Sequence, residues 1–388
     1  MPSLKTGASL LFLACFLILQ LSCGSSSNPN QPTVSGVKPR AFISNTEAGL
    51  LQIIDAGHDT LVTTHSVSIG GRPGLMALTP DKLVTLVFNT ANNTLSVVDN
   101  TQETRRATIT LPSWTESIAV GPNNDVAYAA LPAATVLGQP AGGLAIVGLL
   151  NNQLRATINI PNVHWVVVNH AGNRVLAFSD NSDSVAILDA NGNILKNVSG
   201  FDRPVWAVFS DGDKIAYILN CGPECGGNSA GVTALNMDSN TPGATVGLAG
   251  ATMGLLNNGT LYVAGSGSGV GTLQLVKAAD LSASTPINIS NGYHHRMALA
   301  SNNKLFIGSR GCTNVGSGCL TIFDTSANTA VVDKPNGDVT GIQPIAGRNV
   351  VYVVEGGELR IFDTTTNAPS TKSFIDIVGA ATDVKEVD

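Results

Sequence analysis

The sequence predicts an all-β fold, a β-propeller of eight four-stranded blades, with seven blades as the alternative. The composition favours strands and turns, because charged residues are only 12% of the chain and glycine occurs 41 times. One unit recurs along the chain, made of an alternating apolar run, a short polar turn and a second apolar run. The final residues resemble the one strand that the opening unit lacks.

The recurring unit has the pattern of a β-hairpin. Five clear copies end in aspartate: Arg40–Asp55, Leu83–Asp99, Arg174–Asp189, Lys304–Asp324 and Val350–Asp363. Three weaker copies are Val126–Gly148, Lys214–Met237 and Thr260–Val276. We interpret the aspartates as turn residues that accept hydrogen bonds from nearby backbone N–H groups.

Two further strands are predicted beside each hairpin. A third strand follows it, as in Ala107–Leu111, and an apolar segment precedes the next hairpin, as in Gly74–Asp81. Four strands in about 44 residues is typical of a propeller blade, whose two apolar faces are covered by neighbouring blades. Because Arg40 already begins a hairpin, we expect Asp376–Asp388 to supply the inner strand of the first blade and to close the ring. The propeller is thus predicted at residues 40–388.

The segment from Ser68 to Pro112 resembles the YVTN-type propeller repeat. The motifs that carry the resemblance are Arg72-Pro73-Gly74, Thr79-Pro80-Asp81, Leu86-Val87-Phe88-Asn89 and Val97-Val98-Asp99. The resemblance implies the propeller fold and no particular activity. Members of this family are often seven-bladed, which is why seven remains the alternative.

The N-terminus predicts export. Lys5 and the apolar run Leu10–Leu21 form a signal peptide whose apolar part is short for a transmembrane span. Ser22 and Cys23, followed by a Ser/Asn/Pro-rich segment, resemble a bacterial lipoprotein cleavage site. This resemblance implies a signal peptide at residues 1–22, lipidation of Cys23, a flexible tether at residues 23–39 and a place in the cell envelope. Gly24 is not the aspartate that retains enterobacterial lipoproteins in the inner membrane, which favours the outer membrane or the cell surface. An ordinary cleaved signal and an uncleaved anchor are the alternatives.

The cysteine pattern fits an exported protein, which can retain disulfides. Of six cysteines, Cys15 lies in the signal and Cys23 at the cleavage site. The other four form two local pairs, Cys221–Cys225 and Cys312–Cys319, and we predict two disulfides rather than a shared zinc site. Both pairs lie between the second and third strands of their blades and therefore on one face. The same face is expected to carry long loops at residues 132–143 and 265–271.

That loop-rich face is predicted to bind a ligand at the mouth of the central channel. Alignment of the inner strands places Glu116, His164 and His295 at one level and Trp165, Trp206 and Arg296 one residue further along. A rim of aromatic, arginine and histidine side chains suits a protein, peptide or small-molecule ligand. The predicted ligand-binding residues are Arg72, Trp114, Glu116, His164, Trp165, Arg203, Trp206, His295 and Arg296.

A metal held by Glu116, His164 and His295, with His294 as a fourth ligand, is an alternative, since imidazole and carboxylate suit zinc. These residues belong to the third, fourth and seventh units, so we expect them to be separated across the channel and predict no metal or cofactor. No GxSxG, HExxH or P-loop motif occurs, and no catalytic residue is predicted.

The sequence therefore predicts a lipid-anchored extracytoplasmic binding or scaffold protein whose partners are a membrane and one ligand. The alternative function is a propeller hydrolase or lyase of the lactonase type. Nucleic acid is excluded by the formal charge of −6 and by the absence of a Lys/Arg cluster.

Overall fold

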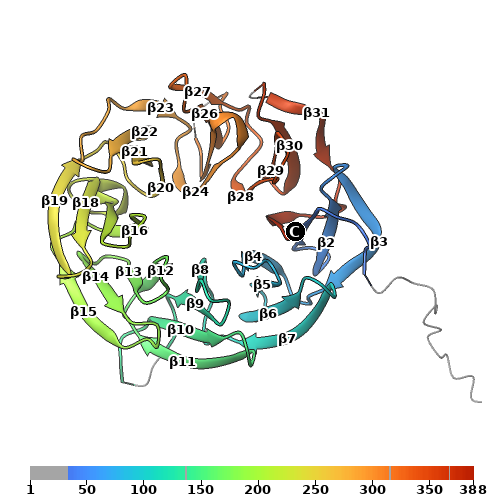
Figure 1. Cartoon of the computed structure of the whole chain (residues 1–388), viewed down its shortest axis with the longest axis horizontal. Helices are drawn as coiled ribbons and strands as arrows, with labels where there is room; N and C mark the ends of the chain where they lie inside the picture. The colour runs from blue at the N-terminus through green and yellow to red at the C-terminus, as the bar shows by residue number, and fades with distance from the viewer. Residues whose placement is uncertain (1–33, 136–137, 314–315, 367) are drawn as a thin grey trace, which may run out of the picture. The chain divides into compact units, whose positions relative to one another are not determined.

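Eight four-stranded antiparallel sheets surround a central channel as the blades of a β-propeller (Figure 1). This computed structural model describes residues 34–388 except 136–137, 314–315 and 367. The predicted signal peptide, Cys23 and most of the tether lie outside the described residues. Within the described ranges, no helix is long and apolar enough to cross a membrane. The predicted propeller fold is confirmed, and the number of blades is eight rather than seven.

Blades are numbered in chain order and each runs from the channel outward. Blade 1 consists of β32 (Ala381–Glu386), β1 (Arg40–Asn45), β2 (Leu50–Asp55) and β3 (Thr60–Ser68). Blade 2 consists of β4 (Pro73–Leu78), β5 (Val84–Asn89), β6 (Thr94–Asp99) and β7 (Thr104–Thr110). Blade 3 consists of β8 (Ser117–Val120), β9 (Val126–Leu131), β10 (Gly143–Gly148) and β11 (Gln153–Asn159). Blade 4 consists of β12 (Val163–Val168), β13 (Val175–Ser179), β14 (Ser184–Leu188) and β15 (Ile194–Ser199).

Blade 5 consists of β16 (Pro204–Phe209), β17 (Ile215–Asn220), β18 (Gly231–Asn236) and β19 (Thr241–Gly247). Blade 6 consists of β20 (Met253–Asn257), β21 (Thr260–Gly267), β22 (Val270–Lys277) and β23 (Ile287–Ile289). Blade 7 consists of β24 (Tyr293–Leu299), β25 (Lys304–Arg310), β26 (Leu320–Asp324) and β27 (Thr329–Val332). Blade 8 consists of β28 (Val339–Pro344), β29 (Val350–Glu355), β30 (Glu358–Asp363) and β31 (Ala368–Ile375). Two short 3₁₀ helices, η1 (Gly222–Cys225) and η2 (Ser301–Asn303), join strands.

The second strand of each blade forms the core, because neighbouring blades cover both of its faces. All six residues of β1, β5 and β9 are buried, which explains why these segments are nearly continuous apolar runs. Outer strands such as β7 and β15 are mostly exposed. The aspartates that end the hairpins accept backbone N–H groups two residues further on, as expected for turn residues: Asp55, Asp99, Asp189, Asp324 and Asp363.

One predicted loop proves to be a strand pair. Residues 265–271 extend β21 and β22, with Gly265 opposite Thr272 and Gly267 opposite Val270. The glycines are needed here because other backbone lies against them: a Cβ on Gly265 would come within 2.3 Å of Ala251 N, and one on Gly271 within 1.7 Å of Ser290 O. The glycine content predicted a loop, whereas it permits the close approach of the segments that enter and leave blade 6.

The C-terminal strand closes the ring, as predicted. β32 pairs antiparallel with β1, with Ile43 opposite Val384, so the first blade is built from both ends of the chain. The Asp383 carboxylate, which is 1% exposed, accepts the Met76 N–H of the next inner strand at 2.8 Å. β32 therefore holds blade 1 to blade 2 as well as completing blade 1.

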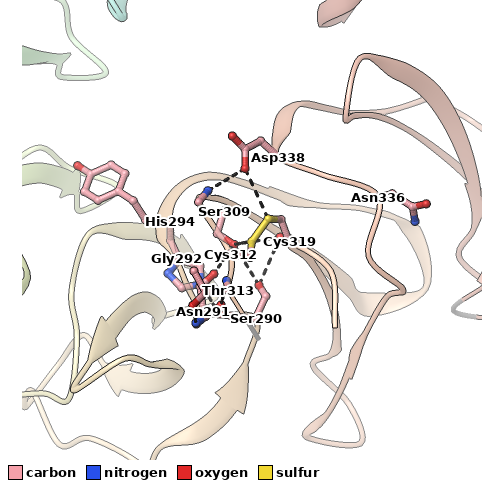
Figure 2. The surroundings of a disulfide bond; sticks show 12 residues. Ser290, Asn291, Gly292, His294, Ser309, Cys312, Thr313, Cys319, Asn336 and Asp338 are labelled. Atoms are coloured by element: carbon pink, nitrogen blue, oxygen red, sulfur yellow. Dashed lines mark hydrogen bonds between the residues drawn. A yellow bond between two sulfur atoms is a disulfide. The ribbon is translucent and has the colours of Figure 1, made fainter. Parts of the chain in front are cut away.

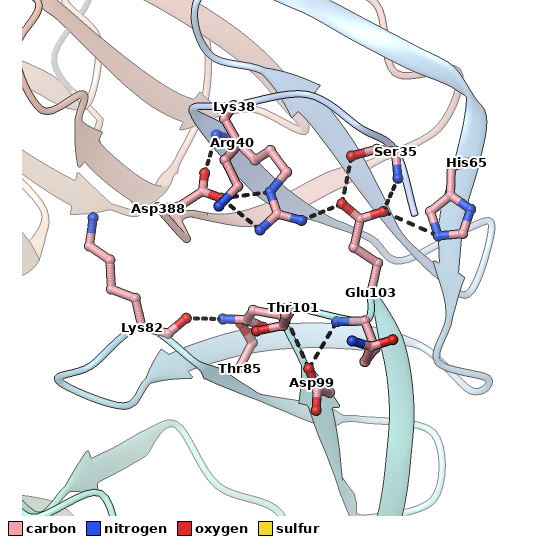
Figure 3. A network of polar contacts seen from close by, with 12 residues as sticks. Ser35, Lys38, Arg40, His65, Lys82, Thr85, Asp99, Thr101, Glu103 and Asp388 are labelled. Carbon is pink, nitrogen blue, oxygen red and sulfur yellow. Dashed lines mark hydrogen bonds and ion pairs between the residues drawn. The ribbon is translucent and has the colours of Figure 1, made fainter. Parts of the chain in front are cut away.

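A buried polar network fastens this closure (Figure 3). Arg40 donates its backbone N–H to Asp388 Oδ1 at 2.6 Å and its Nε–H to Asp388 Oδ2 at 2.9 Å. Its Nη1 also bonds Glu103 in blade 2, whose side chain is fully buried. Burial disfavours the Arg40 charge, but the hydrogen bonds to Asp388 and Glu103 prevail and raise its pKa. Ser35, at the end of the predicted tether, also bonds Glu103 through its Oγ at 2.5 Å, so residues just before the propeller are bound to it.

We expect Arg40→Gln to lower the free energy of unfolding by about 3–5 kcal/mol, because Glu103 would keep a buried charge without its cation. Arg72→Gln is the matched control, since the exposed Arg72 side chain makes no hydrogen bond within the described residues, and it should change stability by less than about 0.5 kcal/mol. Urea unfolding followed by circular dichroism measures both variants. Equal stability of the two would contradict a fastening role for Arg40.

Candidate functional site

The channel mouth is shaped by a β-bulge near the start of several inner strands. The pairing register shifts between Val163 and Trp165 in β12, between Pro204 and Trp206 in β16, and between His294 and Arg296 in β24. A bulge leaves one residue unpaired and re-aims nearby side chains. The unpaired residues include His164 and His295. The bulges therefore place side chains from equivalent positions of different blades at the same height in the channel mouth.

A chain of charged side chains crosses the mouth from blade 4 to blade 7. His164 Nδ1 lies 2.8 Å from Asp180 Oδ2, and His164 Nε2 lies 3.5 Å from Glu116 Oε2. The same Glu116 oxygen accepts a hydrogen bond from Arg310 Nη2 at 3.1 Å. Two positive and two negative groups thus alternate across the channel, and long side chains join blades that are not neighbours.

The charges of this chain are mutually stabilising. Burial alone would lower the pKa of His164, but its hydrogen bonds to Asp180 and Glu116 raise that pKa to about 9. The hydrogen bond with His164, supported by Arg310 and opposed by burial, lowers the pKa of Glu116 to about 2. At neutral pH the imidazole is therefore protonated and the carboxylate ionised.

Aromatic rings form a continuous wall beside these charges. His164 stacks on Trp165 with a centroid distance of 5.0 Å and an interplanar angle of 5°. Trp165 meets Trp206 edge to face at 6.3 Å and faces Tyr293 of blade 7 at 6.4 Å. Arg310 lies over the Tyr293 ring at 5.4 Å, in cation–π geometry. The wall combines apolar area with two fixed cations.

Two adjoining cavities open at the mouth. One of about 90 Å³ is lined from six blades and the other, of about 260 Å³, extends toward blades 2 and 8. The residues that line both are Leu75, Glu116, Trp165, His295 and Arg296. A third pocket, of about 730 Å³, is lined by Glu224 and Thr313 of the two disulfide-bonded loops and by Ser266 of β21. The mouth is thus hollowed where the sequence predicted a ligand.

The predicted residues divide into two groups. Glu116, His164, Trp165, Trp206, His295 and Arg296 gather at the mouth, and Trp114 joins them at the rim, 40% exposed and 5.8 Å from the His164 ring. Arg72 is exposed and contacts neither cavity. Arg203 lines a separate pocket between blades 4 and 5, where its Nη1 lies 3.5 Å from Asp183 Oδ1.

Two mouth residues, Asp180 and Arg310, were not predicted. They occupy equivalent positions at the end of the second strand, because Val163 pairs with Ser179 as His294 pairs with Ser309, and Asp180 and Arg310 are the next residues. Alignment of the second strands in addition to the inner ones could have found them, as Asp180 and Arg310 interrupt a position that is small or polar elsewhere.

The two histidines in β24 are neutral. Burial, helped by the charges of Arg296 and Arg310, lowers the pKa of His295 to about 3. Burial lowers the pKa of His294, which is 0% exposed, to about 4. His294 Nε2 faces the Ser290 carbonyl at 2.9 Å and His294 Nδ1 is buried without a partner. Nowhere in the described part of the chain do three or more His, Cys, Asp or Glu side chains form a group that could hold a metal ion, and Glu116, His164 and His295 do not form one.

Both predicted disulfides are present and stiffen loops beside the mouth. The Cys221–Cys225 loop carries Glu224, whose carboxylate accepts the Ser266 N–H of blade 6 at 2.9 Å. Cys225 also packs against the hydrophobic cluster that contains Trp165. Around Cys312–Cys319, Asp338 accepts the Gly311 N–H at 2.7 Å (Figure 2). Disulfides form in oxidising compartments, and these two point to an extracytoplasmic location.

No family model matches the chain, and no curated protein matches it. Among solved structures, it is similar to dihydro-heme d1 dehydrogenase NirN in complex with DHE, with a TM-score of 0.68, 12% identity, 90% of this chain covered and 75% of that one. A functionally unknown protein from Desulfotomaculum acetoxidans gives a TM-score of 0.54 at 17% identity, covering 76% of this chain and 99% of that one. Kuenenia stuttgartiensis hydrazine synthase gives 0.53 at 18% identity, covering 85% and 93%. At these identities the comparisons establish the fold alone.

The charged chain at the mouth should make stability depend on pH. The pKa of His164 rises on folding from about 6.5 to about 9, so its protonated form stabilises the fold fully below about pH 6.5, and this contribution is lost as the pH rises through about 9. His164→Gln should therefore cost about 1–2 kcal/mol more at pH 6 than at pH 10, after allowance for the partly exposed partners. Urea unfolding of both proteins at the two pH values measures the difference. A cost that is the same at both would show that His164 is not held in its charged form.

Proposed function

We propose that the protein is an extracytoplasmic binding protein, anchored in the cell envelope by lipid on Cys23, that takes a small ligand at the channel mouth. The observation that carries the proposal is the pair of adjoining cavities whose shared wall contains Trp165, Glu116 and Arg296. Concave apolar surface with a few fixed polar groups is the usual form of a ligand site. The lipoprotein-like N-terminus and the two disulfides support the anchored, extracytoplasmic part of the proposal.

The size of the cavities favours a small ligand. Drug-sized ligands occupy pockets of about 300–1,000 Å³. The two mouth cavities, of about 90 and 260 Å³, fall below this range. A scaffold role that uses a large flat surface would leave these cavities unexplained. The disulfide-bonded loops support binding, because ordered loops reduce the entropy lost when a ligand is held.

The pKa values of His164 and Glu116 at the mouth support binding rather than acid–base catalysis. A general acid or base acts best when its pKa is near the working pH. The pKa of His164 is raised to about 9 and that of Glu116 lowered to about 2, so neither exchanges protons readily near neutrality. The Ser117 hydroxyl, which lines the smaller cavity, accepts the Val166 N–H at 3.0 Å. None of these groups favours the lactonase alternative.

Ligand binding should change the tryptophan emission of the protein, because all three tryptophans of the chain lie at the mouth. A fluorescence screen of small metabolites should yield compounds that shift the emission. Trp206→Ala should weaken their binding about 2- to 10-fold through the loss of one aromatic contact. Phe374→Ala is the matched control, since Phe374 is 55% exposed on the outer strand β31. A screen without effect, or equal weakening by both variants, would contradict a binding site at the mouth.

Lipid anchoring is tested separately. Cys23→Ser, expressed in a bacterium that processes lipoproteins, should leave the detergent-rich phase in a Triton X-114 partition and should not incorporate labelled palmitate. The wild-type protein should do both. Incorporation of palmitate by the variant, or none by the wild type, would refute the lipoprotein proposal and leave the mouth site unaffected.

A further inference from the structure

Arg296 is a cation at the channel mouth with unused hydrogen-bonding capacity. Its Nε–H donates to the Thr340 carbonyl at 2.9 Å, and its Nη1 donates to the His295 carbonyl at 3.1 Å. A guanidinium has five N–H groups, so about three of them have no partner among the described residues. Its unpartnered Nη2 is not fully buried, and the side chain lines both mouth cavities. The remaining N–H groups are therefore open to a ligand.

The acidic groups close enough to affect Arg296 are committed elsewhere. Glu116 is bonded to Arg310 and His164. Asp383 accepts the N–H groups of Met76 and Val384 and lies 3.3 Å from Lys385 Nζ. The neighbouring His295 imidazole is neutral, so it cannot serve as the anionic partner of Arg296. Arg296 has no ion-pair partner within the described part of the chain, which contrasts with the paired Arg40 of the closure.

Burial makes this arrangement costly unless an anion completes it. Burial lowers the pKa of Arg296, yet a guanidinium keeps its charge at any physiological pH. A desolvated cation is stabilised by an opposite charge with matching hydrogen bonds. The two carbonyls that hold the guanidinium fix its plane, and a planar, fixed guanidinium suits the two oxygens of a carboxylate.

The smaller cavity around Arg296 is largely apolar, and its one carboxylate, Glu116, is already paired with Arg310 and His164. The smaller cavity is bounded by Trp165 and Trp206 and closed by Leu75, Ile118 and Met253. These residues come from five different blades, so the cavity lies on the channel axis rather than in a loop. Beside the Arg296 guanidinium, these aromatic and aliphatic side chains accept a planar apolar group.

We propose that Arg296 binds the carboxylate of a small organic acid whose flat apolar group packs against Trp165 and Trp206. This inference rests on the proposed binding function and names its ligand class. Two Arg296 N–H groups donate parallel, charge-assisted hydrogen bonds to the two carboxylate oxygens. Arg310 and His164 do not compete for the carboxylate, because Glu116 and Asp180 already neutralise them.

The test compares acids with their uncharged amides on the wild-type protein. The probes are benzoate, phenylacetate, 3-phenylpropionate and indole-3-acetate, each with its primary amide, and dissociation constants are measured by ligand-observed NMR at neutral pH. We expect at least one acid to bind about 10- to 100-fold more tightly than its amide, as is typical for a hydrogen-bonded charge. Failure of all four acids to bind, or amides that bind as tightly as the acids, would overturn the inference without any variant.

Variants then assign the effect to Arg296. Arg296→Gln should weaken binding of the acid about 10-fold or more and leave the amide unchanged, and Arg296→Lys should recover part of the loss. Arg203→Gln, which removes an arginine of the neighbouring pocket, should leave both affinities unchanged. Circular dichroism and unliganded tryptophan emission check that the variants fold. Equal binding of the acid by wild type and Arg296→Gln would refute the inference, whereas amide binding that still depends on Trp206 would keep the proposed binding function intact.

Discussion

The pairing of β32 with β1 is the constraint on which the rest of the structure depends. A sheet of four strands cannot cover its own apolar faces, so each blade needs two neighbours, and a ring supplies them only if it closes. Here the last strand of the chain completes the first blade, and Arg40, Asp388 and Glu103 hold that junction in a buried network. Without the closure, blade 1 would lack its inner strand and expose an unpaired edge.

Closure also creates the mouth. Once the inner strands form a ring, side chains from distant parts of the sequence converge on one axis. Glu116 and Arg310 are 194 residues apart in the chain and 3.1 Å apart in space. The bulges in β12, β16 and β24 direct the converging side chains, and the two disulfide-bonded loops support them from outside. Most charges brought together in this way pair with each other, and Arg296 is the exception on which the proposed ligand class depends.

Much of the fold could be predicted from local pattern. Alternation of apolar residues marks each hairpin and so predicted the blades. The missing inner strand of the first unit and the matching strand at the C-terminus predicted that the ring closes. The two local cysteine pairs predicted the disulfides. The strand pair at Gly265–Gly271 was not predicted, because glycine marks both flexible turns and tight packing, and only the neighbouring backbone at Ala251 and Ser290 distinguishes the two. Within the segment predicted as a flexible tether, residues 23–39, Ser35 bonds Glu103 of the propeller.

The site was less predictable than the fold. Repeat alignment gives the height of a residue along the channel but not the width of the channel, which depends on side-chain length. Residues of the third and seventh units were expected to be separated across the channel, yet Glu116 and Arg310 of these units meet. Asp180 and Arg310 were missed because they lie at the ends of second strands, whereas only the inner strands were aligned. Which charges pair and which stay unpaired depends on distances of a few ångströms, and these are fixed by the closed ring.

Amide hydrogen exchange of the closing strand tests this account most directly. If β32 is part of the cooperative core, the amides of Phe42, Ile43 and Val384 will exchange only through global unfolding, as slowly as those of the central strand β9. If the amides of residues 381–386 exchange within seconds while those of β9 stay protected, then β32 is frayed and the propeller stays folded without it. That result would contradict the claim that the C-terminal strand holds the ring and its channel mouth together.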